Sequence, residues 1–235
     1  MDEETEKLME RERSCIFEVR NEQADLCRQR GSVHFQAGKI DEAIKWYERA
    51  LYHVDFDEGT WHFEFTDKNR ADVNVVRLPV YLNLAACYLV QGAPKDGEVD
   101  MQSLDKVVEN AELALAIDPE NDKALYRSGR ALLLTGHLEG AKAKLTRAAS
   151  HHPTDVNIRK AMTMLKEKVA EQKKEEKMRW GGRLLGKTEA AESKAVSKQR
   201  SLQLKKTSEF SHALWMAAVV LIGIALALGQ LSFVE

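Results

Sequence analysis

The 235-residue sequence contains few of the residues that end helices or cross-link small folds. It has only 4 Pro, 13 Gly and 3 Cys, and aromatic residues make up 7% of it. Few turn formers, together with abundant Ala, Leu, Glu, Lys and Arg, favour an all-α protein over one built from many short strands. The three sparse cysteines, Cys15, Cys27 and Cys87, exclude a disulfide scaffold, and we expect them to be reduced thiols in the cytosol.

A strong net charge is also missing. Lys and Arg number 35 against 37 Asp and Glu, which gives a formal net charge of −2. No global basic field attracts nucleic acid, so we expect no nucleic-acid partner. The acidic residues 1–7 contain neither the basic region nor the apolar run of a secretory signal, and transit peptides avoid acids. A membrane address is therefore expected elsewhere in the chain.

Motifs for catalysis and for metal binding are absent from the sequence. It contains no glycine-rich phosphate loop, no nucleophile elbow and no paired acidic motif. The histidines include the pair His151 and His152, without ligand-like partners, and His62, which has no Cys or His companion nearby. We therefore predict no enzyme, no cofactor and no metal site.

One long apolar run is present, over residues 212–234. From residue 213 it contains no charged residue, and at about 1.5 Å per residue it is long enough to cross a hydrocarbon core of about 30 Å. Basic residues precede it and only Glu235 follows it, so the positive-inside rule places the N-terminal bulk in the cytosol. We predict a post-translationally inserted tail anchor in contact with membrane lipid. The endoplasmic reticulum is the favoured membrane, and the mitochondrial outer membrane is the second choice.

A basic linker over residues 180–211 precedes this run. From Lys166 to Lys206 there are 13 Lys or Arg against 6 Glu. Such a segment buries too little apolar area to fold by itself, so we predict a flexible tether. Two interpretations of its charge stay open: a solvated linker, or contact with anionic lipid head groups.

Small residues recur at fixed intervals within residues 21–179. The first and third sets share the same two intervals, 12 residues and then 7: Gly31, Ala43 and Ala50; Gly129, Ala141 and Ala148. A second set is lengthened between its helices: Ala85, Val107 and Ala114. Small residues let paired helices approach closely, so each set predicts one helix–turn–helix unit.

The predicted architecture is therefore an α-solenoid of three repeats. The extra residues are expected in two connections, 55–65 and 92–102. A capping helix over about 154–179 completes the stack, and an acidic segment, residues 1–20, precedes it. Three repeats and a cap are about the minimum for a stable solenoid.

Residues 22–186 resemble the tetratricopeptide-repeat domain of the large immunophilins, the FK506-binding protein type. The stretches 30–35, 82–87 and 123–129 carry the match, with aligned spacing. In that family a prolyl-isomerase domain comes before the repeats. The short segment 1–20 leaves no room for it, so the resemblance implies a repeat domain without isomerase activity.

The resemblance also implies a carboxylate clamp for the Glu-Glu-Val-Asp C-terminus of heat shock protein 90 or 70 chaperones. Carried over residue by residue, the clamp consists of Arg28, Ser32, Asn83, Lys123 and Arg127. Arg28 stands where the family has lysine and Ser32 where it has asparagine, which puts the first-repeat contacts in doubt. Independently of the family, Arg28 and Ser32 share a helix face, as do Lys123 and Arg127. Charge-assisted hydrogen bonds to the peptide carboxylates are worth about 1.5–3 kcal/mol each, so we expect roughly micromolar affinity. The predicted function is that of a membrane-anchored co-chaperone or adaptor.

Two other functions stay open on the sequence. A membrane-tethered scaffold would bind a partner through the convex face or the long loops, with Trp61, Phe63 and Phe65 as anchors. Regulation by lipid or calmodulin would use the basic helix 166–179, although its many glutamates argue against this.

Overall fold

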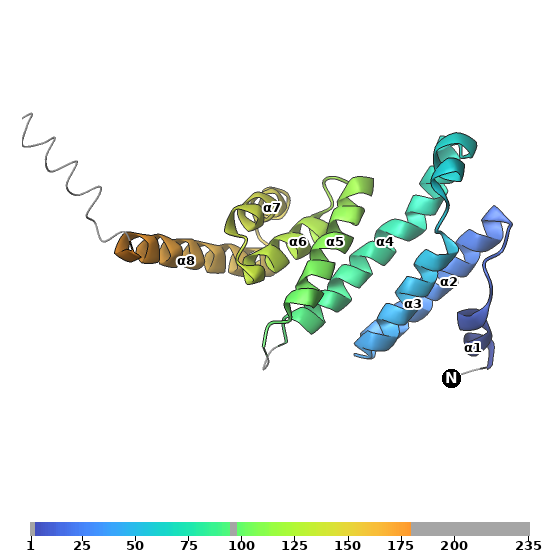
Figure 1. The fold of residues 1–235 in the computed structure, drawn as a ribbon, viewed down its shortest axis with the longest axis horizontal. Helices are drawn as coiled ribbons and strands as arrows, with labels where there is room; N and C mark the ends of the chain where they lie inside the picture. The colour runs from blue at the N-terminus through green and yellow to red at the C-terminus, as the bar shows by residue number, and fades with distance from the viewer. Residues whose placement is uncertain (1–2, 95–97, 180–235) are drawn as a thin grey trace, which may run out of the picture. The chain divides into compact units, whose positions relative to one another are not determined.

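Helices make up all the regular structure in residues 3–94 and 98–179, the part of the chain that the computed structural model describes (Figure 1). In chain order they are α1 (Glu3–Glu10), α2 (Phe17–Gln36), α3 (Ile40–His53), the π-helical turn η1 (Thr60–Glu64), α4 (Asp67–Gly92), α5 (Met101–Ile117), α6 (Asp122–Thr135), α7 (Leu138–His151) and α8 (Val156–Arg179). The predicted linker 180–211 and the predicted anchor 212–234 lie outside the described residues.

The chain divides into two compact units, Met1–Glu171 and Gln172–Glu235. The described residues of the second unit are the last turns of α8. There the Gln172 side-chain amide donates a hydrogen bond to Glu176 over 3.3 Å. Every site considered below lies within the first unit.

The first unit consists of three antiparallel helix pairs, as the sequence predicts. Helix α2 packs on α3, α4 on α5, and α6 on α7, and the first helices of the pairs, α2, α4 and α6, contact one another in succession (Figure 1). The small residues of the predicted repeats have no exposed surface: Ala43, Ala50, Ala85, Ala111, Ala114, Ala141 and Ala148. The solenoid prediction is therefore confirmed for this unit. Helix α2 begins at Phe17, a few residues before the predicted boundary at 21.

Two glycines allow the closest approaches between paired helices. A Cβ atom on Gly31 of α2 would lie 2.6 Å from Cε1 of Tyr47 on α3. A Cβ atom on Gly129 of α6 would lie 2.8 Å from Cγ of Leu145 on α7. Tyr47 and Leu145 are both buried, so each large side chain fills the space that the facing glycine leaves free.

The first lengthened connection is more ordered than the predicted loop over 55–65. It contains η1, and α4 begins directly after it behind a capping box between Thr66 and Asn69. Aromatic packing explains the order, because the rings of Phe17, Phe56 and Phe65 lie 4.7–5.8 Å apart, centroid to centroid. The second connection matches the prediction better, since α4 ends at Gly92 and α5 begins at Met101.

Arginines fix the same connection to the helices. The Arg20 guanidinium lies 3.6 Å from the Phe56 ring centroid and donates to the His53 carbonyl over 2.7 Å. The Arg77 guanidinium lies 4.6 Å from the Trp61 ring centroid. Cations at carbonyls near the C-terminus of α3 also complement its dipole. The aromatic residues are thus folded back onto the repeats, apart from Phe63, whose side chain is 89% exposed.

The predicted capping helix is α8, and its first half closes the stack. Ile158, Ala161 and Leu165 of α8 are buried, the last two in a cluster with Leu133 and Leu145. Lys168 of α8 also donates to the Leu133 carbonyl over 3.2 Å. The third repeat would otherwise expose this apolar face, so α8 completes its core.

Within the described residues, α4 is the one helix long and apolar enough to cross a membrane by length and composition. It packs against α2, α3, α5 and α6. Its apolar residues, among them Val80, Leu84 and Ala85, are buried in the repeat core. This packing identifies α4 as the core helix of the second repeat.

Candidate functional site

The predicted clamp residues come from α2, α4 and α6, and a tyrosine from a fourth helix lies among them. The Tyr47 hydroxyl on α3 donates to Ser32 Oγ on α2 over 3.2 Å, and Ser32 Oγ donates to the Arg28 carbonyl over 3.0 Å. Burial raises the pKa of Tyr47, while interactions with Ser32, Arg28 and Asn83 oppose that rise. Arg28, Ser32 and Asn83 therefore meet at the Tyr47 hydroxyl.

The first-repeat cation has a carboxylate beside it. Arg28 Nε and Nη2 both contact Asp25 Oδ1, each over 2.7 Å, and Gln29 Nε2 donates to Asp25 Oδ2 over 2.7 Å. Asp25 lies three residues before Arg28, so the two share a helix face. It neutralises part of the charge that Arg28 would offer to an anionic ligand.

The third-repeat cation, Arg127, lies near Tyr47 as well. Arg127 on α6 donates from Nη1 to the Leu82 carbonyl on α4 over 2.8 Å, next to Asn83. Burial lowers the pKa of Arg127, and Tyr47 and Cys87 lie close enough to oppose that shift. No carboxylate pairs with Arg127 in the described part of the chain. Its charge is thus desolvated and open to an anionic partner.

Lys123 lies one helical turn before Arg127 and is exposed. Helix α6 starts there because the Asn121 side chain accepts a hydrogen bond from the Ala124 backbone N–H over 3.2 Å. Lys123 lines a pocket of about 290 Å³ whose other residues come from α6, α8 and the connection between α7 and α8: Asp122, Tyr126, His152, Asp155, Asn157 and Ile158. The structure thus places four predicted residues around Tyr47 and Lys123 at the margin.

Two residues at this centre were not predicted as site residues. Tyr47 has a repeat-forming position in the sequence, but its hydroxyl becomes a site group only because Gly31 lets the ring reach α2. Asp25 carries a readable signal, a carboxylate three residues before an arginine. Together the site offers amide and guanidinium donors and an ammonium group at its edge, a set suited to carboxylate oxygens.

The nearby thiol and the histidines give no evidence of other chemistry. Burial raises the pKa of Cys87 to about 12, against the opposing charge of Arg127, so the group is a neutral thiol at pH 7. Within residues 3–94 and 98–179, no group of three or more His, Cys, Asp or Glu side chains is placed to hold a metal ion.

Comparison with known proteins agrees with the repeat geometry. The family profile described as tetratricopeptide repeat matches residues 24–54, which contain most of α2 and α3. A second profile with the same description matches residues 99–165, from α5 into α8. The chain contains tetratricopeptide repeats. The long helix α4 lies between the two matched segments.

The tetratricopeptide repeats are similar to those of FKBP4-type immunophilins. The chain is 25% identical to bovine peptidyl-prolyl cis-trans isomerase FKBP4 over 160 residues. The aligned region covers 68% of this chain and 32% of that protein. The chain thus spans about a third of the length of this relative.

Two solved structures resemble the repeat fold. The C-terminal repeat domain of a Plasmodium falciparum FK506-binding protein matches with a TM-score of 0.58 and 29% identity, covering 68% of this chain and 96% of that one. The Saccharomyces cerevisiae protein Cns1 matches with a TM-score of 0.52 and 22% identity, covering 68% of this chain and 44% of that one. The second likeness concerns the fold alone.

Proposed function

We propose that this protein is a non-catalytic adaptor that binds the acidic C-terminal tail of heat shock protein 90 or 70 chaperones. The tail would end in Glu-Glu-Val-Asp and lie across α2, α4 and α6. Its terminal carboxylate and Asp side chain would accept hydrogen bonds from Arg127, Asn83 and Lys123, with Ser32 and Arg28 on the first-repeat side. The similarity to FKBP4-type repeats supports this proposal.

The observation that carries the proposal is the unpaired guanidinium of Arg127. A desolvated cation that donates to a backbone carbonyl at 2.8 Å has donors left, and no carboxylate pairs with it in the described residues. Charge-assisted bonds from such a group are stronger than bonds between neutral groups. An acidic peptide would supply a carboxylate to pair with the Arg127 guanidinium.

The test is a titration of the full chain with a labelled peptide ending in Glu-Glu-Val-Asp, as free acid and as C-terminal amide. We expect the amide to bind at least about tenfold more weakly, since one charge-assisted contact is worth about 1.5–3 kcal/mol. Lys123→Ala and Arg127→Ala should each cause a similar loss.

Lys142→Ala is the matched control, because Lys142 is an exposed lysine on α7 away from the clamp residues. It should leave the affinity unchanged. Thermal unfolding of each variant separates loss of binding from loss of fold. Equal affinity for the acid and the amide, or full binding by both clamp variants, contradicts the proposal.

We also propose that residues 212–234 anchor the protein in a membrane, with the repeats in the cytosol. The uncharged apolar run and the basic residues before it support this proposal. We favour the endoplasmic reticulum over the mitochondrial outer membrane. The tether, residues 180–211, would concentrate bound chaperones at the membrane surface.

A second candidate function is a scaffold whose partner binds the first lengthened connection. The exposure of Phe63, at 89%, favours it, whereas Trp61 and Phe65 are half-buried against the core. We expect Phe63→Ala to leave the unfolding free energy unchanged within about 0.5 kcal/mol. Proteins that precipitate with the Phe63→Ala and Lys123→Ala variants can be compared by mass spectrometry. A cellular partner that is lost from Phe63→Ala but kept by Lys123→Ala would favour the scaffold. The same set of partners in both precipitates would eliminate it.

A further inference from the structure

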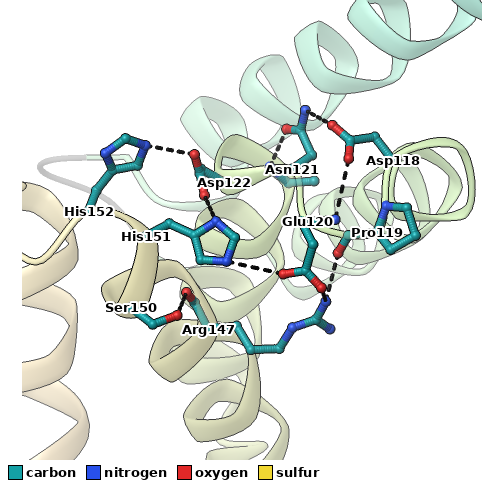
Figure 2. A network of polar contacts seen from close by, with 10 residues as sticks. Asp118, Pro119, Glu120, Asn121, Asp122, Arg147, Ser150, His151 and His152 are labelled. Carbon is teal, nitrogen blue, oxygen red and sulfur yellow. Dashed lines mark hydrogen bonds and ion pairs between the residues drawn. The ribbon is translucent and has the colours of Figure 1, made fainter.

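Two adjacent histidines join the C-terminus of α7 to the start of α6. Figure 2 shows His151 between the carboxylates of Asp122 and Glu120, with Nδ1 2.9 Å from Asp122 Oδ1 and Nε2 3.1 Å from Glu120 Oε2. His152 Nε2 lies 2.7 Å from Asp122 Oδ2. Each carboxylate oxygen of Asp122 therefore has its own imidazole partner. The sequence, by contrast, gives these histidines no evident partners.

Each contact of His151 joins a ring nitrogen to a carboxylate oxygen. A neutral imidazole has one N–H donor and one lone pair, whereas an imidazolium has two N–H donors. Both ring nitrogens of His151 face carboxylate oxygens at about 3 Å, so a positive charge on the ring would be attracted by both carboxylates. His152 has one such contact, which a neutral ring can make with its single N–H. A charge on either ring would therefore act directly on Asp122.

These contacts adjoin a predicted clamp residue. Asp122, Lys123 and His152 line the same 290 Å³ pocket, and Asp155 adds a second carboxylate. The charged groups that contact the two histidines or line the pocket with His152 come from the turn before α6, from α6 and from the connection after α7: Glu120, Asp122, Lys123 and Asp155. Glu120 is partly neutralised, because Arg147 Nη2 lies 2.6 Å from Glu120 Oε1.

We infer that His151 and His152 form a pH-dependent latch, through which Lys123 and the pocket that it lines bind acidic peptides more tightly at mildly acidic pH. With both rings protonated, Asp122 is neutralised on both oxygens, and Lys123 attracts a carboxylate with little opposition. With both rings neutral, Asp122 and Asp155 are uncompensated beside Lys123 and repel the same ligand. This inference rests on the proposed peptide-binding function.

The direction follows from which groups change charge. Histidine is the side chain that ordinarily titrates between pH 5 and 8, whereas Asp and Glu of the peptide stay ionised throughout pH 5.5–7.5. Removing one or two positive charges from the pocket that Lys123 lines, in partly screened surroundings, corresponds to about a threefold to tenfold change in affinity. Affinity therefore falls as the pH rises through this range.

The experiment titrates the full chain with the free-acid Glu-Glu-Val-Asp peptide at pH 5.5 and 7.5 and constant ionic strength. We expect the Kd to be about threefold to tenfold lower at pH 5.5. His151→Gln/His152→Gln should abolish the difference and bind weakly at both pH values. Asp122→Asn should bind more tightly than the wild type at pH 7.5, because the repelling carboxylate is gone.

His137→Gln is the matched control, since His137 is an exposed histidine at the opposite end of α7. It should keep the wild-type pH dependence. A pH dependence that persists unchanged in the double histidine variant overturns the latch, because other groups then cause it.

A second readout does not need the peptide. In NMR spectra recorded at a fixed pH, Asp122→Asn should shift the ring resonances of His151 and His152, because both rings contact the Asp122 carboxylate. Unchanged ring resonances overturn the latch. Absence of peptide binding at both pH values, with shifted ring resonances, instead overturns the proposed function and leaves the latch as a link between α6 and α7.

Discussion

Acidification from pH 6.5 to pH 4 should lower the free energy of unfolding by about 3 kcal/mol through one residue, His53. His53 ends α3 and has no exposed surface. Burial first, and then the charges of Arg49, Arg13, Arg20 and Arg11, lower the pKa of His53 from 6.5 to about 4. The unfolded chain therefore binds a proton in this interval that the folded chain does not, and stability is lost as the pH falls.

Urea unfolding at several pH values between 4 and 7 tests this expectation. His53→Leu should flatten the dependence, because the buried position no longer titrates. His62→Gln should follow the wild type, since His62 is exposed on η1. A variant His53→Leu that loses stability over the interval as steeply as the wild type would show that other groups are responsible.

Gly31→Ala should lower the free energy of unfolding by about 1–3 kcal/mol. The new methyl group would lie within 3.0 Å of three atoms of the Tyr47 ring, which is only 1% exposed and has no room to move. Alanine is the better helix former by about 1 kcal/mol, and this gain offsets only part of the overlap. Displacing the ring also moves the Tyr47 hydroxyl away from Ser32, so peptide affinity should fall together with stability.

Gly140→Ala provides the matched control. Its methyl group would meet only Cδ1 of Leu132 at 3.2 Å, the end of a flexible side chain, so we expect no loss, or a gain below about 1 kcal/mol. In the background of Tyr47→Ala, Gly31→Ala should become neutral or stabilising, because the ring that it strikes is gone. Additive effects of the two changes would refute the steric explanation.

The repeats were readable from the sequence because their cause is local. Small residues at intervals of 12 and 7 place the helix crossings, and the same residues are fully buried in the structure. The first lengthened connection was predicted less well. Its order depends on Phe17 of α2 meeting Phe56 and Phe65, and on Arg77 of α4 covering Trp61. Contacts between distant elements leave no periodic pattern in the sequence.

The candidate site, too, could be predicted where it depends on local spacing but not where it depends on contacts between distant elements. The placement of Arg28 and Ser32 on α2, and of Lys123 and Arg127 on α6, follows from helical spacing. The meeting of the two helices at Tyr47 depends on tertiary packing. The carboxylate partners of His151 and His152 were missed for the same reason, since Asp122 lies 30 residues away from His152 in the sequence.

The burial of two of the three cysteines makes the protein selective toward thiol reagents. Cys15 is exposed, whereas burial raises the pKa of Cys27 to about 11 and that of Cys87 to about 12. Maleimides and iodoacetamides react with the thiolate, so at pH 7 they modify the natural Cys15 first. A fluorophore there needs no engineered cysteine. Cys87, beside Arg127, becomes reactive only when the helices around it separate, so its alkylation rate reports how often these helices separate.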